Sequence, residues 1–150
     1  ESGMGAITGV VLTPLKTIEG ASGNVMHAMK ATDPGYQGFG EAYFSSVNHG
    51  ARKGWKKHHE MTLNLVVVSG VIRFILYDDR PGSDSFHQFQ EVELSIQNYQ
   101  RLTVPPGVWM AFTGKAMGTN MLLNIASIPH DPNEAENLPI ENELIHYEGF

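Results

Sequence analysis

Short apolar runs, separated by turn residues, dominate the middle of the chain. Residues 62–68 and 71–77 are rich in β-branched and other apolar side chains, and the Ser69-Gly70 pair between them is a tight-turn signal. Residues 88–94 alternate apolar and polar side chains, as a half-buried strand does. The pattern therefore predicts a β-hairpin over residues 62–77, followed by a further strand.

More strands are predicted on both sides of this hairpin. Residues 7–15 suit an edge strand because Gly9 and Pro14 interrupt them, and residues 24–30 favour a strand over one helical turn. The remaining candidates are residues 41–47, 100–104, 109–113, 120–128 and, as a strand or a short helix, 141–147. About eight to ten short strands without a clear amphipathic helix predict an all-β fold, an antiparallel sandwich or barrel.

Length and composition suit one globular domain. The chain has 150 residues, of which 41% are hydrophobic and 17% are charged. A chain of this size can bury roughly two thirds of the surface that it exposes when unfolded. We expect residues 1–150 to form a single domain, and we set aside residues 1–3, which precede the first methionine.

Charge and residue usage exclude several classes of function. The formal net charge of −6 argues against a general nucleic-acid-binding protein, which needs a basic surface. The chain has no cysteine, which excludes disulfides, thiolate metal ligands and cysteine nucleophiles. No apolar run approaches the roughly 20 residues that span a bilayer. We expect a cytoplasmic protein with no nucleic-acid partner and no membrane association.

A basic cluster directly before the hairpin is the strongest candidate for chemistry. It contains Lys56, Lys57, His58 and His59. An imidazole can accept a proton near neutral pH, and an ammonium group can stabilise a developing oxyanion. Because alternate strand residues share a face, Lys57 pairs with His59 and Lys56 with His58. For a regular strand we expect Lys57 and His59 inside, with Lys56 contributing only if a bulge re-aims it; the alternative is a solvated edge strand.

An ordered set of motifs follows the cluster. A strand that starts at a glycine ends in Asp-x-Arg, a Gly-Ser loop follows, the next strand ends in Leu-Ser before an Asn turn, and a Pro-x-Gly segment ends in Phe. The residues are Asp78, Arg80, Gly82, Ser83, Leu94, Ser95, Asn98, Pro105, Gly107 and Phe112. In this order they resemble the dTDP-4-dehydrorhamnose 3,5-epimerase family.

The resemblance carries expectations for fold and function. It implies a cupin-type antiparallel jelly-roll barrel, a homodimer, and a site that needs no metal and no other cofactor. It implies a nucleotide-linked 4-keto sugar as the small-molecule partner. The expected reaction is epimerisation or isomerisation by removal of a proton next to the ketone, in the synthesis of sugars for surface polysaccharides. The alternative is a non-catalytic cupin that binds a sugar or a nucleotide.

The family's site can be carried over residue by residue. Its Arg-x-x-His motif falls on residues 56–59, which gives Lys56 the arginine position and His59 the role of the base. The match needs a one-residue gap near Trp55, so His58 stays a candidate. Asn48 matches an asparagine that precedes the motif, and His27 falls in the nucleotide-binding motif, whose arginine and glutamate are absent here.

The family's proton donor is absent from its expected place. The tyrosine that serves as the acid is matched by Leu123, and a second family tyrosine falls near His130, which is a candidate substitute. Single epimerisation or ketoisomerisation is then as compatible with the sequence as the double reaction.

Three more residues are candidates for substrate binding. Trp109 could stack on a base or a sugar ring. Arg73 and Tyr77 share one face of residues 71–77 and could line the cavity or a dimer surface. A metal site is disfavoured because His58 and His59 are adjacent rather than alternating, and Met110 stands where cupins place their last histidine ligand.

Overall fold

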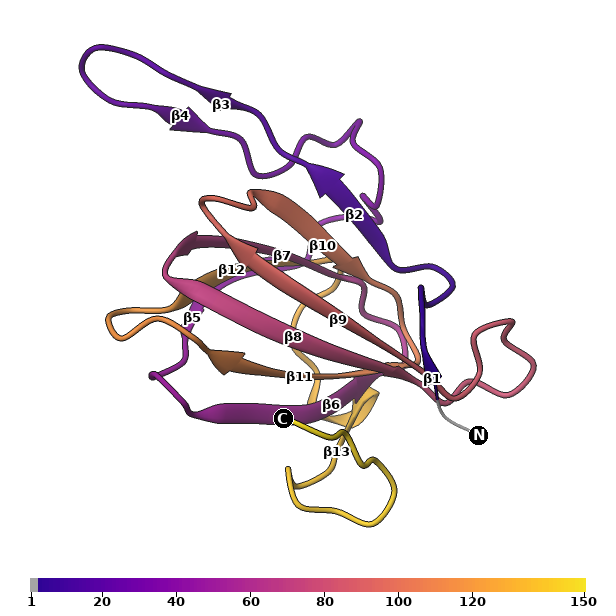
Figure 1. Cartoon of the computed structure of the whole chain (residues 1–150). Helices are drawn as coiled ribbons and strands as arrows, with labels where there is room; N and C mark the ends of the chain where they lie inside the picture. Colours follow the sequence, from indigo (N-terminus) through magenta and orange to yellow (C-terminus); the bar gives the residue numbers. More distant parts are fainter. Residues whose placement is uncertain (1–2) are drawn as a thin grey trace.

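The computed structural model describes residues 3–150, and nearly all of its regular structure is β-strand (Figure 1). The strands are β1 (Gly3–Met4), β2 (Val11–Pro14), β3 (Thr17–Ile18), β4 (Val25–Met26), β5 (Glu41–Ser46), β6 (Arg52–His58), β7 (Leu63–Ser69), β8 (Val71–Asp78), β9 (Gln88–Ser95), β10 (Gln100–Val104), β11 (Val108–Gly114), β12 (Met121–Ala126) and β13 (Ala135–Asn137), and η1 (Pro132–Glu134) is a short 3-10 turn. The predicted all-β class is confirmed. Across the described residues, no helix is long and apolar enough to cross a membrane.

Two sheets face each other and form the body of the molecule (Figure 1). The six-stranded sheet has the order β1-β9-β8-β11-β6-β13, and the five-stranded sheet has the order β2-β10-β7-β12-β5. Neighbouring strands are antiparallel apart from β1 and β9. The predicted hairpin is present as β7 and β8, yet its two strands belong to different sheets. The turn between them therefore joins the two layers of an antiparallel barrel.

Gly70 makes this turn possible. Its φ angle is +74°, and a Cβ atom at this position would lie 2.4 Å from the carbonyl oxygen of Thr119. Only glycine adopts this backbone conformation without strain and leaves room for the neighbouring chain.

Alternation along β8 separates two faces of the six-stranded sheet. Ile72, Phe74 and Leu76 point into the core between the sheets, where they pack with apolar residues of β7. Burying each such side chain stabilises the fold by about 1.5–3 kcal/mol. Arg73 and Tyr77, expected as possible cavity residues, lie on the opposite, outer face. The apolar face of β8 forms the core, so of the two predicted roles the cavity lining is excluded for Arg73 and Tyr77, and the dimer surface stays a prediction.

The outer face carries a second apolar cluster. Trp55, Tyr77, Phe89 and Trp109 belong to it, and Ile145 from the C-terminal segment packs against them. The strand or helix predicted over residues 141–147 is wrong, since this segment has no regular structure. Side-chain packing on the sheet, rather than backbone pairing, holds it in place.

The family motif Asp-x-Arg with its Gly-Ser loop builds a turn rather than a site. Asp78 accepts hydrogen bonds from Arg80 Nε at 2.8 Å, Ser83 Oγ at 2.7 Å and Ser85 Oγ at 2.6 Å. Burial would raise the pKa of Asp78, but these bonds outweigh burial and hold the pKa well below its usual range. The ionised carboxylate fixes the end of β8.

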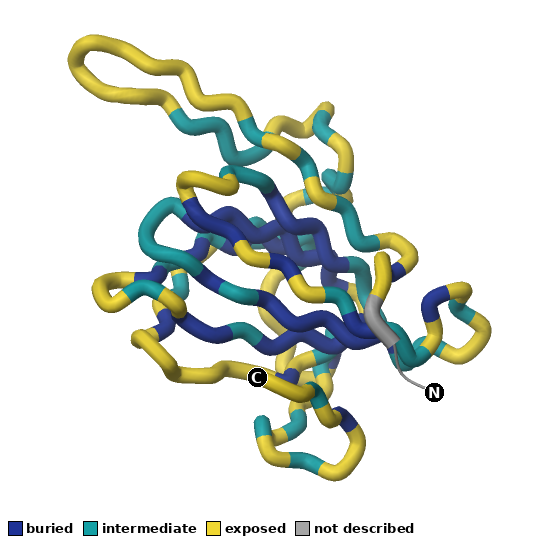
Figure 2. The backbone as a smooth tube through the Cα atoms, in the orientation of Figure 1, coloured by how far each residue is buried: buried dark blue, intermediate teal, exposed yellow. Residues whose placement is uncertain are grey.

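A hairpin of β3 and β4 extends away from the two sheets (Figure 1). It contains only two residue pairs, and its residues are largely exposed (Figure 2). The strand predicted over residues 24–30 is therefore present only as Val25–Met26. The predicted edge strand within residues 7–15 is confirmed, since β2 lies at the edge of the five-stranded sheet.

Candidate active site

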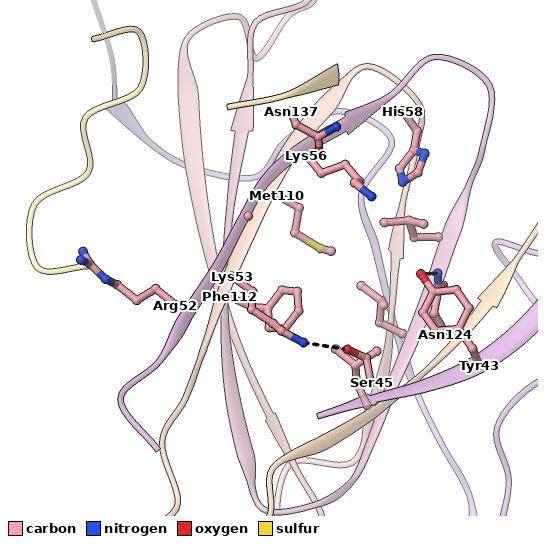
Figure 3. Close-up of a pocket in the computed structure, with 14 residues that line it drawn as sticks. Tyr43, Ser45, Arg52, Lys53, Lys56, His58, Met110, Phe112, Asn124 and Asn137 are labelled. Carbon is pink, nitrogen blue, oxygen red and sulfur yellow. Dashed lines mark hydrogen bonds between the residues drawn. The ribbon is translucent and has the colours of Figure 1, made fainter. Parts of the chain in front are cut away.

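A cavity of about 340 Å³ lies between the two sheets beside β6 (Figure 3). Its floor is apolar, and its polar side chains come from β5, β6, β12 and β13. The lining residues are Tyr43, Ser45, Arg52, Lys53, Gly54, Lys56, His58, Leu63, Leu65, Met110, Phe112, Leu122, Asn124 and Asn137. An apolar pocket with a few convergent polar groups is the usual form of a small-molecule site.

A bulge in β6 decides which basic residues enter the cavity. Met110 pairs with Lys56, but Phe112 pairs with Lys53, so two steps on β11 match three on β6. Gly54 sits inside this bulge with a φ of +130°, and a Cβ atom there would lie 2.7 Å from Ala111 Cα. The extra residue shifts the alternation, and Lys53 and Lys56 both line the cavity.

Lys56 and His58 are the pair that lines the cavity, whereas Lys57 and His59 were expected there. That expectation is corrected. Lys56 does share a face with His58, and Lys57 with His59. Trp55 lies on the second of these faces, and its burial under the C-terminal segment turns that face outward.

The outward pair takes part in a surface ion network. Lys57 Nζ lies 3.4 Å from Asp79 Oδ1 and 3.6 Å from Glu136 Oε2, above the ring of Trp109. His59 Nε2 lies 3.2 Å from Glu136 Oε2. Trp109 donates from Nε1 to Asp79 Oδ2 at 2.8 Å. Trp109 is thus held on the outer face and does not line the cavity.

His58 is bonded to a buried carboxylate. Its Nδ1 is paired with Oε1 of Glu134, which comes from η1 and is only 4% exposed. The other oxygen, Oε2, accepts hydrogen bonds from the backbone N–H groups of Glu60 at 3.1 Å and Met61 at 3.2 Å. Strand β13, directly after Glu134, pairs with β6 and holds the carboxylate against the imidazole.

These contacts keep Glu134 ionised. Burial would raise the pKa of Glu134, but the bonds from His58, Glu60 and Met61 outweigh burial and lower the pKa below its usual range. An ionised carboxylate accepts the Nδ1 proton of His58, which leaves Nε2 of the neutral ring as the atom that can take up a proton. The pair therefore has the arrangement of an oriented general base.

The cations of the cavity differ in how they are paired. Lys53 Nζ donates to Ser46 O at 2.7 Å and to Ser45 Oγ at 3.3 Å, which links β6 to β5 (Figure 3). Arg52 lies 3.3 Å from Glu141. Among the described residues, Lys56 has no carboxylate within ion-pair distance. Its ammonium group is therefore available to an anionic or polar ligand.

A phenol from the opposite sheet completes the polar lining. Tyr43 on β5 accepts a hydrogen bond from Asn124 Nδ2 at 3.0 Å (Figure 3). The two residues are register partners on neighbouring strands. Leu123, which the resemblance placed at the acid position, does not line this cavity.

The other predicted binding residues lie elsewhere. Asn48 and His130 are exposed, outside regular strands and away from the cavity lining. His27 follows β4, where its carbonyl oxygen accepts a hydrogen bond from the Tyr99 hydroxyl. Arg73 bonds to Glu91 and to the carbonyl oxygen of Gly149 on the outer face. The structure does not bring these residues into the cavity with His58.

Several site residues escaped the sequence prediction. Tyr43 had a weak signal, because it alternates with Ser45 in a predicted strand. Glu134 and Asn124 had none, since they lie far from the basic cluster in sequence. Within residues 3–150, no group of three or more His, Asp or Glu side chains is placed to hold a metal ion.

Comparison with known proteins adds independent evidence. A family model described as dTDP-4-dehydrorhamnose 3,5-epimerase matches residues 6–147. No curated protein matches the chain. A crystal structure of a dTDP sugar isomerase from Desulfovibrio desulfuricans G20 shares 34% identity with a TM-score of 0.85, covering 89% of this chain and 85% of that one.

Two other solved structures show how widely the fold is shared. ChmJ, a 3'-monoepimerase from Streptomyces bikiniensis in complex with dTDP-quinovose, has a TM-score of 0.81 at 14% identity, covering 92% of this chain and 73% of that one. A mutant of the 3,4-ketoisomerase QdtA from Thermoanaerobacterium thermosaccharolyticum has a TM-score of 0.72 at 20% identity. The match covers 87% of this chain and 88% of that one. These similarities confirm the predicted cupin-type jelly roll.

Proposed function

The chain belongs to the dTDP-4-dehydrorhamnose 3,5-epimerase family, and from this premise we propose that it epimerises or isomerises a nucleotide-linked 4-keto sugar. The observation that carries the proposal is the cavity that the oriented imidazole of His58 and the side chain of Lys56 both line. We assign the base to His58, in place of His59.

The reaction needs a base that can reach a weakly acidic C–H bond beside the ketone. His58 Nε2 takes this proton, and the electron pair of the C–H bond moves toward the ketone and forms an enolate. Glu134 stabilises the imidazolium ion that results, because its carboxylate already accepts the Nδ1 proton. A positioned general base of this kind contributes about 10²–10⁴-fold to the rate.

Lys56 serves the other end of the enolate. It lines the same cavity as His58 and has no described carboxylate partner, so its positive charge is free to stabilise the negative oxygen. Lys56 is exposed at the mouth of the cavity, above a floor formed by Leu63, Leu65 and Leu122, so a bound substrate would itself shield this charge from water. Lys53, farther along β6, bonds to the neutral oxygens of Ser45 and Ser46 and so can offer positive charge to the diphosphate of the substrate.

The family also suggests an assembly and a place of action. We propose that the protein is a homodimer and that the projecting β3–β4 hairpin, with its exposed Ile18 and Val25, takes part in the contact. A solution mass equal to the 16.5 kDa monomer would overturn this proposal.

We further propose that the protein works in the cytoplasm and supplies sugars for surface polysaccharides.

Proton exchange with solvent tests the function directly. The protein is incubated with TDP-4-keto-6-deoxyglucose in D₂O, and NMR follows deuterium entry at each sugar carbon. We expect exchange next to the ketone, and its positions distinguish single epimerisation, double epimerisation and ketoisomerisation. His58→Ala is the matched negative control.

Two results would overturn the proposal. One is the absence of exchange with the unmodified protein, and the other is unchanged exchange in His58→Ala. Tight binding of the sugar nucleotide without any exchange would instead favour a non-catalytic sugar-binding cupin.

A further inference from the structure

We propose that Tyr43 is the proton donor of this enzyme and that it protonates the sugar carbon on the face opposite to His58. The inference rests on the proposed function and concerns the same cavity. The sequence left this role open, because the residue at the expected acid position is Leu123, which does not line the cavity.

The two sheets place Tyr43 and His58 on opposite walls. Tyr43 belongs to β5, at the edge of the five-stranded sheet, whereas His58 belongs to β6 of the six-stranded sheet. Both side chains line the same cavity (Figure 3). A sugar ring bound between the sheets would therefore present one face to the imidazole and the other to the phenol.

The connection between the strands indicates the depth at which Tyr43 lies. Residues 47–51 join β5 to β6, and the bonds from Lys53 to Ser45 and Ser46 bridge the two strands near this loop. Moving away from the loop, the next inward residue on β5 is Tyr43, and those on β6 are Lys56 and His58. Counted from the loop, Tyr43 is thus one inward position along β5, as Lys56 is along β6, and His58 is the next inward position.

Asn124 gives the phenol a fixed orientation and a charge preference. Its Nδ2 donates to the Tyr43 oxygen at 3.0 Å, so the phenol proton is not used in this bond and remains available to a ligand. When the proton leaves, the same N–H group stabilises the phenolate. Asn124 is 1% exposed, which holds this donor in place.

The other lining groups fit the role less well. Lys53 is engaged with Ser45 and Ser46, and the hydroxyl of Ser45 is a far weaker acid than a phenol. His130 is exposed and outside the cavity lining. Of the described residues that line the cavity, Tyr43 alone carries a phenol.

The step balances without a further reactant. The electron pair of the enolate forms a new C–H bond with the Tyr43 proton, the O–H bond breaks, and the ketone is restored. The inverted product leaves, with His58 as imidazolium and Tyr43 as phenolate. Proton exchange with water resets both groups, since Tyr43 is 45% exposed and His58 is 11% exposed.

The substitution Tyr43→Phe tests the role by separating two readouts. In D₂O, we expect deuterium exchange beside the ketone to continue, because His58 can return a deuteron to the same face. Formation of the inverted sugar should fall by about 10²-fold or more. Tyr36→Phe, in a half-buried loop tyrosine outside the cavity, is the matched control and should behave as the unmodified protein.

The outcomes separate the inference from the function on which it rests. Inversion by Tyr43→Phe at the unmodified rate overturns the role of Tyr43 alone, as does loss of both exchange and inversion in a folded variant. Failure of the unmodified protein to exchange overturns the proposed function instead.

A second measurement covers a Tyr43→Phe variant that does not fold. Replacing Tyr43 with a fluorinated tyrosine makes the phenol more acidic with little change in shape. We expect the alkaline limb of the pH–rate profile for inversion to move to lower pH. An unmoved limb would contradict proton donation by Tyr43.

Discussion

Strand β6 presents one lysine and one histidine on each of its faces, and the two pairs differ only in their surroundings. Lys56 and His58 face the cavity, whereas Lys57 and His59 face outward. His58 is bonded to a carboxylate that is 4% exposed, but the carboxylate beside His59 is 51% exposed. Lys57 has two carboxylate partners, and Lys56 has none among the described residues.

This comparison shows that environment, rather than residue type, assigns the chemistry. On the outer face, the carboxylates that pair with Lys57 and His59 are 34% and 51% exposed, and ion pairs to such partly exposed groups contribute about 0–1 kcal/mol to stability. On the inner face, a buried carboxylate orients the imidazole of His58, and Lys56, which has no carboxylate partner among the described residues, lines the same cavity. Only the inner pair combines a base in a fixed tautomer with a charge that a substrate can use.

The largest expected contrast is between the two histidines. We expect His58→Ala to lower the rate of proton exchange by about 10³-fold, because it removes the general base. His59→Ala should change the rate by less than about threefold, since it removes only a half-exposed partner of Glu136. NMR exchange rates in D₂O for both variants check this, and a larger loss in His59→Ala would reverse the assignment.

The two lysines should differ by a smaller factor. Lys56→Met removes the charge that stabilises the enolate, and we expect about a 10²-fold lower kcat. Lys57→Met should leave kcat within about threefold and cost at most about 1 kcal/mol in unfolding free energy. Steady-state kinetics and urea unfolding of both variants measure the contrast. Equal losses of kcat would mean that Lys56 has no specific role.

Strands were predictable where the apolar residues follow the spacing of a strand. The orientation of a strand was not predictable where polar and charged residues dominate it. Residues 62–77 have both signals, and they form β7 and β8. Strand β6 is rich in basic residues, and its pairing with β11 and β13 makes it a strand. Its inward face could not be read from the sequence, because the bulge at Gly54 shifts the alternation and a distant C-terminal segment buries Trp55.

The candidate site was predictable only in its local part. The basic cluster is contiguous, so it stood out in the sequence, and two of its four residues line the cavity. Glu134 lies 76 residues after His58, in an acidic segment rich in turn formers. Tyr43 belongs to the other sheet. Contacts between such distant residues arise from strand pairing and sheet packing, which leave no local pattern.

The smallest expected contrast in reaction rate is between substitutions of Glu134 and Glu136, the carboxylates that partner His58 and His59. Glu134→Gln removes the charge that stabilises the His58 imidazolium ion, and we expect kcat to fall about tenfold with KM little changed. Glu136→Gln is the matched control on the outer face and should keep the rate within about twofold. A shift in the acidic limb of the pH–rate profile in Glu134→Gln alone would separate orientation of the base from general loss of structure.

Stability as a function of pH sharpens the same contrast. The pKa of Glu134 is lowered in the folded protein, so its stabilising effect is complete above the pKa of an unfolded glutamate, about 4.3, and is lost as pH falls through the lower folded value. Glu134→Gln should therefore be about 1–3 kcal/mol less stable at pH 7, because charged hydrogen bonds are lost. The gap should narrow on acidification toward pH 3, while Glu136→Gln stays close to the unmodified protein throughout. Urea unfolding at several pH values measures both, and a gap that widens with acid would mean that Glu134 is protonated in the folded protein and cannot orient His58 as an anion.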